Sequence, residues 1–231
     1  MVARRPGPRK RAGVAGRLSL AQVTAMGWWD RHVVPHLIRL ACSQGETMKR
    51  RALVVPQARG AVLEVGCGGW INLGLYDRAR LSRLVGLDPH PALARMARER
   101  ARDLDLPLRV VEGVAEELPF STAAFDTVVV TFTLCSVRDP EAALAEIRRV
   151  LAPGGHLLFL EHGLAPDPGV ARTQRRLEPL WRRLAGGCHL TRPVTSGIVS
   201  AGFRLLAGDR GYARRAPRFA GWMEWGVAEK A

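Results

Sequence analysis

The sequence lacks long apolar stretches. No uninterrupted apolar run in its 231 residues approaches the roughly 18 that a membrane-spanning helix needs. The N-terminal region is charged, and Arg17 and Gln22 keep its apolar residues from forming a segment of signal-peptide length. We therefore expect a cytoplasmic protein without a secretory signal.

Cysteine is also scarce, and its spacing excludes the usual metal-binding patterns. The chain has four cysteines, and none forms a Cys-x-x-Cys pair or a Cys/His cluster with metal-ligand spacing. They are Cys42, Cys67, Cys135 and Cys188. The simplest interpretation is a reduced protein without a metal site.

Lysine is rare, yet the chain is strongly basic. Lys and Arg total 35 against 21 acidic residues, which gives a net charge of +14. The excess gathers in residues 1–17 and residues 172–218. GC-rich coding explains such an arginine bias as well as function does. The functional alternative is attraction to an anionic surface, such as lipid headgroups or nucleic acid.

The length and pattern predict one domain behind a short tail. Residues 1–17 have no periodicity and are predicted to be disordered, and residues 18–231 form the domain. Within it we expect N-terminal helices in residues 18–57, broken near Ser43–Gly45, and a ligand-binding core in residues 58–163. Residues 164–231 would hold a basic helical insertion, with helices at 170–184 and 193–201, and a final antiparallel hairpin from 203–206 and 223–227.

The core alternates strands and helices. Strands are predicted at 61–65, 84–88, 108–111, 125–132 and 156–161, with helical segments at 70–80, 91–102 and 140–151. This alternation is typical of a doubly wound, Rossmann-like parallel α/β sheet.

The first strand runs into a glycine-rich turn, Gly66-Cys-Gly-Gly69. Glycines at such a turn let backbone N–H groups approach a ligand. Asp88 ends the second strand, twenty residues after Gly68, where an acid can accept both ribose hydroxyls of a nucleoside. The combination indicates a nucleoside-containing ligand at the carboxyl ends of the strands.

A series of motifs in this order resembles the class I S-adenosylmethionine-dependent methyltransferases. The segments are Val62–Gly68, Leu87–Pro89, Gly113–Phe120, Phe125-Asp126 and Arg149–Gly155. The resemblance implies S-adenosylmethionine as cofactor and a seven-stranded sheet whose last strand is antiparallel. Thr133–Val137, Leu160–His162 and Gly187–Arg192 are similar to the methyltransferase type 11 subgroup, which contains thiol S-methyltransferases and bacterial phospholipid N-methyltransferase-like proteins.

The resemblance also implies roles for individual residues. Glu64, Gly66, Cys67 and Gly68 would shape the pocket for the methionine part of the cofactor, and Asp88 with Pro89 would hold the ribose. Ala115 would meet the adenine through its backbone with Glu116 nearby, and Thr131 would close the floor. His162 and His189 are candidates for a catalytic base, although each is as readily explained as a structural histidine.

Two positions depart from the family pattern. Trp70 stands where the third glycine of the turn is usual, and Val114 stands where an acid often accepts from the adenine amine. Trp70 suggests crowding of the cofactor. It therefore supports an alternative: a non-catalytic protein that binds S-adenosyl ligands through a degenerate turn.

The acceptor of the methyl group is left open by the sequence. We expect a small molecule, with a thiol or an amine or lipid headgroup as the leading classes. A nucleic-acid acceptor is not expected, because Thr131-Phe-Thr-Leu-Cys135 lacks the acceptor and stacking ring that base-methylating enzymes carry there. Peripheral contact with an anionic membrane through the basic helix 170–184 is a hypothesis, and the sequence does not determine the oligomeric state.

Overall fold

The computed structural model of the protein describes residues 45–102 and 108–231. The expected tail, residues 1–17, and the first part of the N-terminal helical region lie outside these residues. The second piece of that region is a helix, α4 (Gly45–Val54), followed by the short 3-10 turn η1 (Val55–Gln57).

A seven-stranded sheet forms the centre of the molecule, in the order β3-β2-β1-β4-β5-β7-β6. The strands are β1 (Gly60–Val65), β2 (Leu81–Asp88), β3 (Leu108–Glu112), β4 (Phe125–Thr131), β5 (Leu151–His162), β6 (Phe203–Tyr212) and β7 (Trp222–Lys230). β1 to β5 pair in parallel, and β7 runs antiparallel to both β5 and β6. The predicted sheet with an antiparallel last strand is confirmed.

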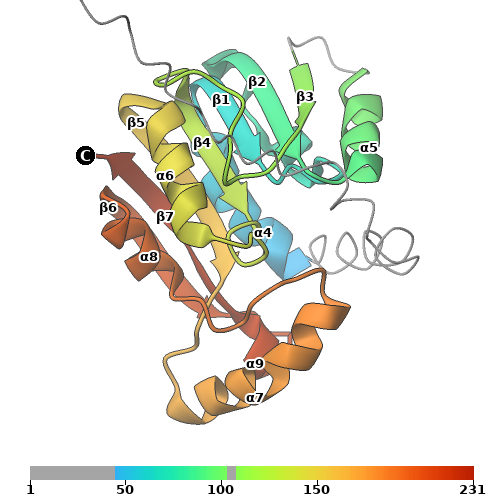
Figure 1. The fold of residues 1–231 in the computed structure, drawn as a ribbon, viewed down its shortest axis with the longest axis vertical. Helices are drawn as coiled ribbons and strands as arrows, with labels where there is room; N and C mark the ends of the chain where they lie inside the picture. The colour runs from blue at the N-terminus through green and yellow to red at the C-terminus, as the bar shows by residue number, and fades with distance from the viewer. Residues whose placement is uncertain (1–44, 103–107) are drawn as a thin grey trace, which may run out of the picture.

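Helices cover both faces of the sheet (Figure 1). α6 (Pro140–Val150) and α8 (Val194–Ser200) lie in front in this view, and α4 lies behind. α5 (Pro91–Arg102) packs against β2 and β3. α7 (Pro168–Leu184) and α9 (Arg218–Gly221) lie together at the end of the molecule where β5 finishes.

The alternation of side chains along each strand divides the core in two. In β4, Val128 and Val130 belong to the cluster under α6 and α8, whereas Val129 belongs to the cluster under α4. The central strands are buried on both faces, as a parallel sheet requires. Because ligands bind where parallel strands end, the carboxyl ends of β1, β2, β4 and β5 define the site.

The structure corrects several predicted elements. The segment 70–80 is not an α-helix but two 3-10 turns, η2 (Ile71–Leu75) and η3 (Arg78–Arg80), because Trp70 enters it with a left-handed backbone. β5 begins at Leu151 rather than 156, since Leu151 already pairs with Phe125. β6 extends to Tyr212 because its pairing with β7 continues that far.

Candidate active site

The turn after β1 is left-handed at every second residue. Gly66, Gly68 and Trp70 have φ of 70°, 52° and 55°. A Cβ on Gly66 would lie 2.2 Å from Oγ1 of Thr133, whereas a Cβ on Gly68 would meet nothing within 4 Å. Glycine is therefore required at 66 by the neighbouring loop, and the turn is open above Gly68, where a ligand can approach the backbone.

Asp88 holds this turn from the end of β2. Its carboxylate accepts the N–H of Gly68 and the N–H of His90, each at 2.8 Å. Burial raises the pKa of the carboxyl, while the two N–H groups lower it. Each oxygen keeps lone pairs for further donors. The position and chemistry fit the ribose role, and Pro89 beside it is exposed.

Trp70 is fully buried rather than standing above the turn. Its indole packs in the core under α4, and its Nε1 donates to Oε2 of Glu64 at 2.7 Å. The expectation that the Trp70 side chain crowds the cofactor is therefore wrong. Trp70 adopts the left-handed conformation that glycine usually takes at this position, and its burial compensates for that strain.

Glu64 and Thr131 belong to a buried polar network instead of presenting free atoms to a ligand. The Glu64 carboxylate accepts from Trp70, from Nδ2 of Asn72 at 2.8 Å and from the hydroxyl of Tyr76 at 2.7 Å. Burial raises the pKa of Glu64 to about 7, although these three hydrogen-bond donors lower it. Oγ1 of Thr131 accepts from Asn72 at 3.0 Å. The network supports the floor of the expected pocket.

Arg51 of α4 completes that network and was missed by sequence reasoning. Its Nη1 donates to Oδ1 of Asn72 and to Oγ1 of Thr131, both at 2.7 Å. Within residues 45–102 and 108–231 its buried Nε has no partner. A buried N–H calls for an acceptor, and a carboxylate on a ligand, such as that of a methionine group, would supply one. The residues present therefore fit the expected cofactor. A basic residue in a helix gives no sequence signal of burial.

Cys67 and Ala115 can contribute to a ligand site only through their backbones. The Cys67 side chain is buried beneath the turn, and its N–H donates to the carbonyl of Leu87 at 3.0 Å. Ala115 is also buried, and its N–H has no acceptor in the part of the chain that the structure describes. That free donor suits a ligand base.

The carboxylate of Glu116, which was expected near the adenine, is bonded to the backbone before α6. Its Oε1 accepts the N–H groups of Arg138 and Asp139 at 2.8 and 3.3 Å. It thereby fixes the start of α6, so an adenine contact by this side chain would require these bonds to be given up.

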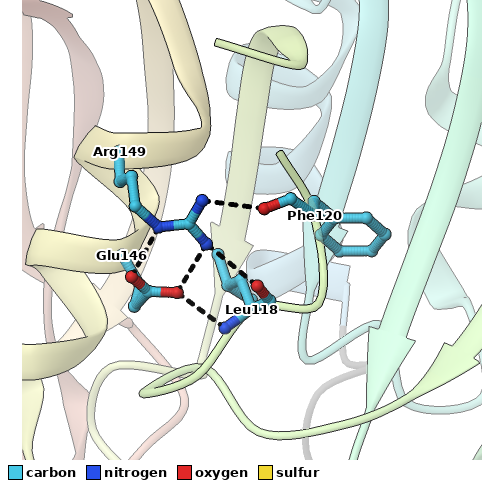
Figure 2. A network of polar contacts seen from close by, with 4 residues as sticks. All are labelled: Leu118, Phe120, Glu146 and Arg149. Atoms are coloured by element: carbon cyan, nitrogen blue, oxygen red, sulfur yellow. Dashed lines mark hydrogen bonds and ion pairs between the residues drawn. The ribbon is translucent and has the colours of Figure 1, made fainter. Parts of the chain in front are cut away.

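The loop that carries Ala115 and Glu116 is also held from α6 (Figure 2). Arg149 donates through Nη1 to the carbonyl of Phe120 at 2.7 Å and through Nη2 to that of Leu118 at 2.9 Å. Glu146 accepts the N–H of Leu118 at 2.8 Å and pairs with Arg149 at 2.7 Å. The ion pair lowers the pKa of Glu146. This clamp positions the expected adenine side of the site.

Glu161, near the end of β5, anchors the loop that follows β4. The carboxylate is fully buried and accepts the N–H groups of Thr133, Leu134 and Cys135 at 2.8, 3.0 and 3.1 Å. Burial raises its pKa to about 7, whereas the three N–H groups lower it. Glu161 lies within the Leu160–His162 motif, and the motif by itself does not reveal this anchoring role.

His162 lies beside this loop. Its ring centroid is 4.8 Å from that of Phe132, and burial lowers its pKa to about 4. The imidazole is therefore neutral near pH 7. Its Nδ1 is buried, and no described residue partners it.

His189, the other candidate base, occupies a different position. It follows α7, and its Nδ1 lies 2.9 Å from Oε1 of Glu178. Its backbone N–H donates to the carbonyl of Cys135 at 2.7 Å. Burial lowers the pKa of His189, opposed by the bond to Glu178. Within the described residues, the ring of His189 contacts Glu178 and the ring of His162 contacts Phe132, and no contact joins the two rings.

Comparison with known proteins agrees with this geometry. A methyltransferase domain family matches residues 63–159. The human thiol S-methyltransferase TMT1B is 34% identical over 210 residues, which cover 84% of this chain and 85% of that protein. The chain belongs to the class I S-adenosylmethionine-dependent methyltransferases. It is an enzyme of that family, and its cofactor is S-adenosylmethionine.

Other methyltransferases are similar over shorter stretches. The rat TMT1B is 36% identical over 146 residues, 62% of this chain and 59% of that protein. A phosphatidylethanolamine N-methyltransferase of Cereibacter sphaeroides is 38% identical over 128 residues, 54% of this chain and 61% of that protein. Relatives at comparable identity thus bear names for different acceptors.

Solved structures confirm the fold. An S-adenosylmethionine-dependent methyltransferase of Methanosarcina mazei gives a TM-score of 0.61 at 21% identity, covering 75% of this chain and 93% of that chain. The [4+2]-cyclase SpnF gives the same TM-score at 20% identity, covering 85% of this chain and 80% of that chain. The fold alone therefore does not determine the acceptor chemistry.

The described ranges contain no helix long and apolar enough to cross a membrane. They also contain no group of three His, Cys, Asp or Glu residues placed to hold a metal ion. α7 carries its arginines beside two exposed leucines, Leu180 and Leu184. Contact of this surface with an anionic membrane stays a prediction.

Proposed function

We propose that the enzyme transfers the methyl group of S-adenosylmethionine to a small apolar thiol. The observation that carries this proposal is a layer of aromatic and cationic groups at the ends of β4 and β5. The guanidinium of Arg51 lies 5.1 Å from the ring centroid of Phe132, which in turn contacts His162.

Arg50 extends the same layer. It is buried, it stacks 4.5 Å from the ring centroid of Trp225, and its Nη2 donates to the carbonyl of Tyr212 at 2.9 Å. Two buried guanidinium groups favour a nucleophile that becomes negative, such as a thiolate, over one that arrives as an ammonium ion. The nearby carboxylates of Glu64 and Glu161 are each engaged by three donors and offer little to a cation.

The bound cofactor supplies an activated methyl group on a sulfonium centre. The chain's contribution is then proximity, orientation and exclusion of water. The turn at Gly68 and the carboxylate of Asp88 would hold the nucleoside end, and Arg51 would receive the carboxylate of the amino-acid end. Phe132 would offer an apolar wall for the acceptor.

His162 would orient the thiol rather than store its proton. A thiol has an ordinary pKa of about 8.5, well above the value of about 4 for His162. Full proton transfer to this ring is therefore unfavourable. Its unpartnered Nδ1 can accept an S–H hydrogen bond, and the proton leaves to solvent as the thiol ionises.

A radiolabelled methyl-transfer assay tests the proposal. The purified full chain receives labelled S-adenosylmethionine with an alkyl thiol, with the alcohol of the same chain length as matched control, with phosphatidylethanolamine vesicles, or with RNA. We expect label in the methyl thioether and none in the ether. The rate should rise with pH as the thiol ionises.

The Cereibacter sphaeroides relative supports an amine headgroup as the second candidate. Label in methylated phosphatidylethanolamine with none in the thioether would replace the thiol proposal. Label in RNA alone would overturn both small-molecule acceptors. Binding of S-adenosylmethionine without transfer to any of these acceptors would overturn both the thiol and the amine candidates.

A further inference from the structure

Two segments far apart in sequence are fastened together beside the acceptor end of the sheet. The N–H of His189 donates to the carbonyl of Cys135 at 2.7 Å. Arg192 donates through Nη1 to the carbonyl of Leu134 and through Nη2 to that of Val137. The loop after β4 and the segment between α7 and α8 are thereby held in a fixed relation.

These hydrogen bonds bring together two segments that each carry a free thiol. Cys135 and Cys188 are both unpaired and buried, with 1% and 7% of their surface exposed, and the bond from the N–H of His189 to the carbonyl of Cys135 holds their backbones side by side. We propose that Cys135 and Cys188 form a redox modification site, in which a peroxide joins them as a disulfide that links the loop after β4 to the segment after α7.

The two thiols are not equivalent. The neighbouring side chain of Cys135 lowers the pKa of Cys188, and the charge of Arg192 lowers it further. The side chain of Cys188, together with burial, raises the pKa of Cys135 well above its usual range. Since the thiolate is the reactive form, Cys188 is the attacking sulfur and Cys135 the resolving one.

The reaction balances with one peroxide. The Cys188 thiolate attacks a peroxide oxygen, the O–O bond breaks, and hydroxide leaves and takes up a proton to become water. The Cys135 sulfur, losing its proton, attacks the resulting sulfenic acid, and the S–O bond breaks as a second water leaves. Two thiols lose two electrons in all, and one peroxide is reduced to two waters.

The disulfide would act on the acceptor side of the site. The N–H of Cys135 is one of the three that donate to Glu161. The loop is therefore anchored at the same residue that the disulfide would displace. A disulfide requires an S–S distance of about 2.05 Å, shorter than any hydrogen-bonded contact between thiols. The link therefore displaces the loop that starts at Phe132.

Peptide mapping of the oxidised full-length chain tests the site directly. The reduced protein is treated with hydrogen peroxide, its remaining thiols are alkylated, and the digest is analysed by mass spectrometry. We expect one linked pair of peptides, holding Cys135 and Cys188, that separates after dithiothreitol. No link, or a link through Cys42 or Cys67, would overturn the proposal. This result does not depend on the identity of the acceptor.

The effect on activity is measured in Cys135→Ala, Cys188→Ala and, as matched control, Cys67→Ala, a buried cysteine outside the pair. Each oxidised rate is divided by the reduced rate of the same variant. Because thiol acceptors reduce disulfides, initial rates are taken and the link is quantified in the same sample. We expect about a tenfold loss or more in the wild type and Cys67→Ala, since a 1 Å displacement of a positioned group can cost about 100-fold. Equal loss in Cys188→Ala would contradict the proposal.

Discussion

Trp70 shows how one residue can break a sequence pattern and still preserve its backbone. The third position of the turn requires a left-handed conformation, with φ of 55°. Tryptophan is strained there, but burial of the indole and its bond to Glu64 hold it in place. The departure from the glycine pattern therefore concerns stability rather than access to the cofactor.

Replacing Trp70 should destabilise the fold. Trp70→Gly loses a buried indole, worth about 3–5 kcal/mol, and recovers about 1–2 kcal/mol of backbone strain, so unfolding in urea should show a net loss. Trp70→Phe keeps one aromatic ring but loses the donor to Glu64, at a cost of about 1–3 kcal/mol, and part of the buried ring volume. Unchanged stability of Trp70→Gly would mean that the indole does not pack as described.

Asp88 should be the main polar determinant of cofactor affinity. Asp88→Ala removes a charged acceptor for the ribose and releases the N–H of Gly68. Loss of such a bond costs about 1.5–3 kcal/mol, which is roughly a tenfold to hundredfold weaker Kd by calorimetry. Glu112→Ala is a matched control, because Glu112 is the residue of β3 in register with Asp88 and its side chain is exposed. Unchanged affinity in folded Asp88→Ala would refute the ribose role.

His162 should make stability depend on pH. Its folded-state pKa of about 4 lies below the ordinary 6.5, so the unfolded chain binds the extra proton between these values. The free energy of unfolding should therefore fall as pH drops from 6.5 towards 4. His162→Phe removes this term. The difference in free energy of unfolding between wild type and variant, measured in urea, should change by about 2–3 kcal/mol between pH 6.5 and pH 4. A difference that stays constant with pH would contradict the assignment.

At the scale of elements, loops acquire fixed positions through side chains of neighbouring helices and strands. α6 holds the loop between β3 and β4 through Arg149 and Glu146 (Figure 2). Glu161 of β5 holds the loop after β4. Both loops lack regular structure, yet each lies at the ligand end of the sheet. Several of their backbone N–H and C=O groups bond to side chains of α6 or β5, and the sequence pattern assigns those residues only to a helix or a strand.

Arg149→Met should loosen the loop that carries Ala115. Two hydrogen bonds to loop carbonyls disappear, so we expect a stability loss of about 1–3 kcal/mol and weaker cofactor binding by calorimetry. Arg148→Met serves as control. Arg148 lies next to Arg149 on α6, but its Nη2 donates to the carbonyl of Ala231 at 2.8 Å, away from the loop. Equal effects of the two variants would argue against a specific clamp.

At the scale of the whole molecule, the site depends on parts from both ends of the described chain. α4 reaches β4 through Arg51 and the end of β6 through Arg50. Gln174 of α7 accepts from the N–H of Ala165 at 2.9 Å and donates to the carbonyls of Gly163 and Phe219 at 3.1 Å. The acceptor side of the sheet is thus enclosed by segments that the methyltransferase core motifs do not include.

Deleting residues 1–17 should leave fold and methyl transfer intact. The segment has six basic residues, no acidic residue and no apolar periodicity with which to dock. Thermal unfolding of the truncated chain should match that of the full chain. A melting temperature lower by several degrees would show that the domain begins before residue 18.

The sequence by itself determined the parallel α/β core, the glycine turn, the place of Asp88 at the end of the second strand and the family, because these follow from local periodicity and from motifs of fixed spacing. Only the tertiary structure decided how the polar side chains are used. Arg50 and Arg51 are buried, Trp70 lies in the core, Glu116 binds the start of α6, and the N–H of His189 donates to the carbonyl of Cys135. Each of these depends on partners many residues away, and a side chain's direction is set by such partners rather than by its own neighbours in sequence.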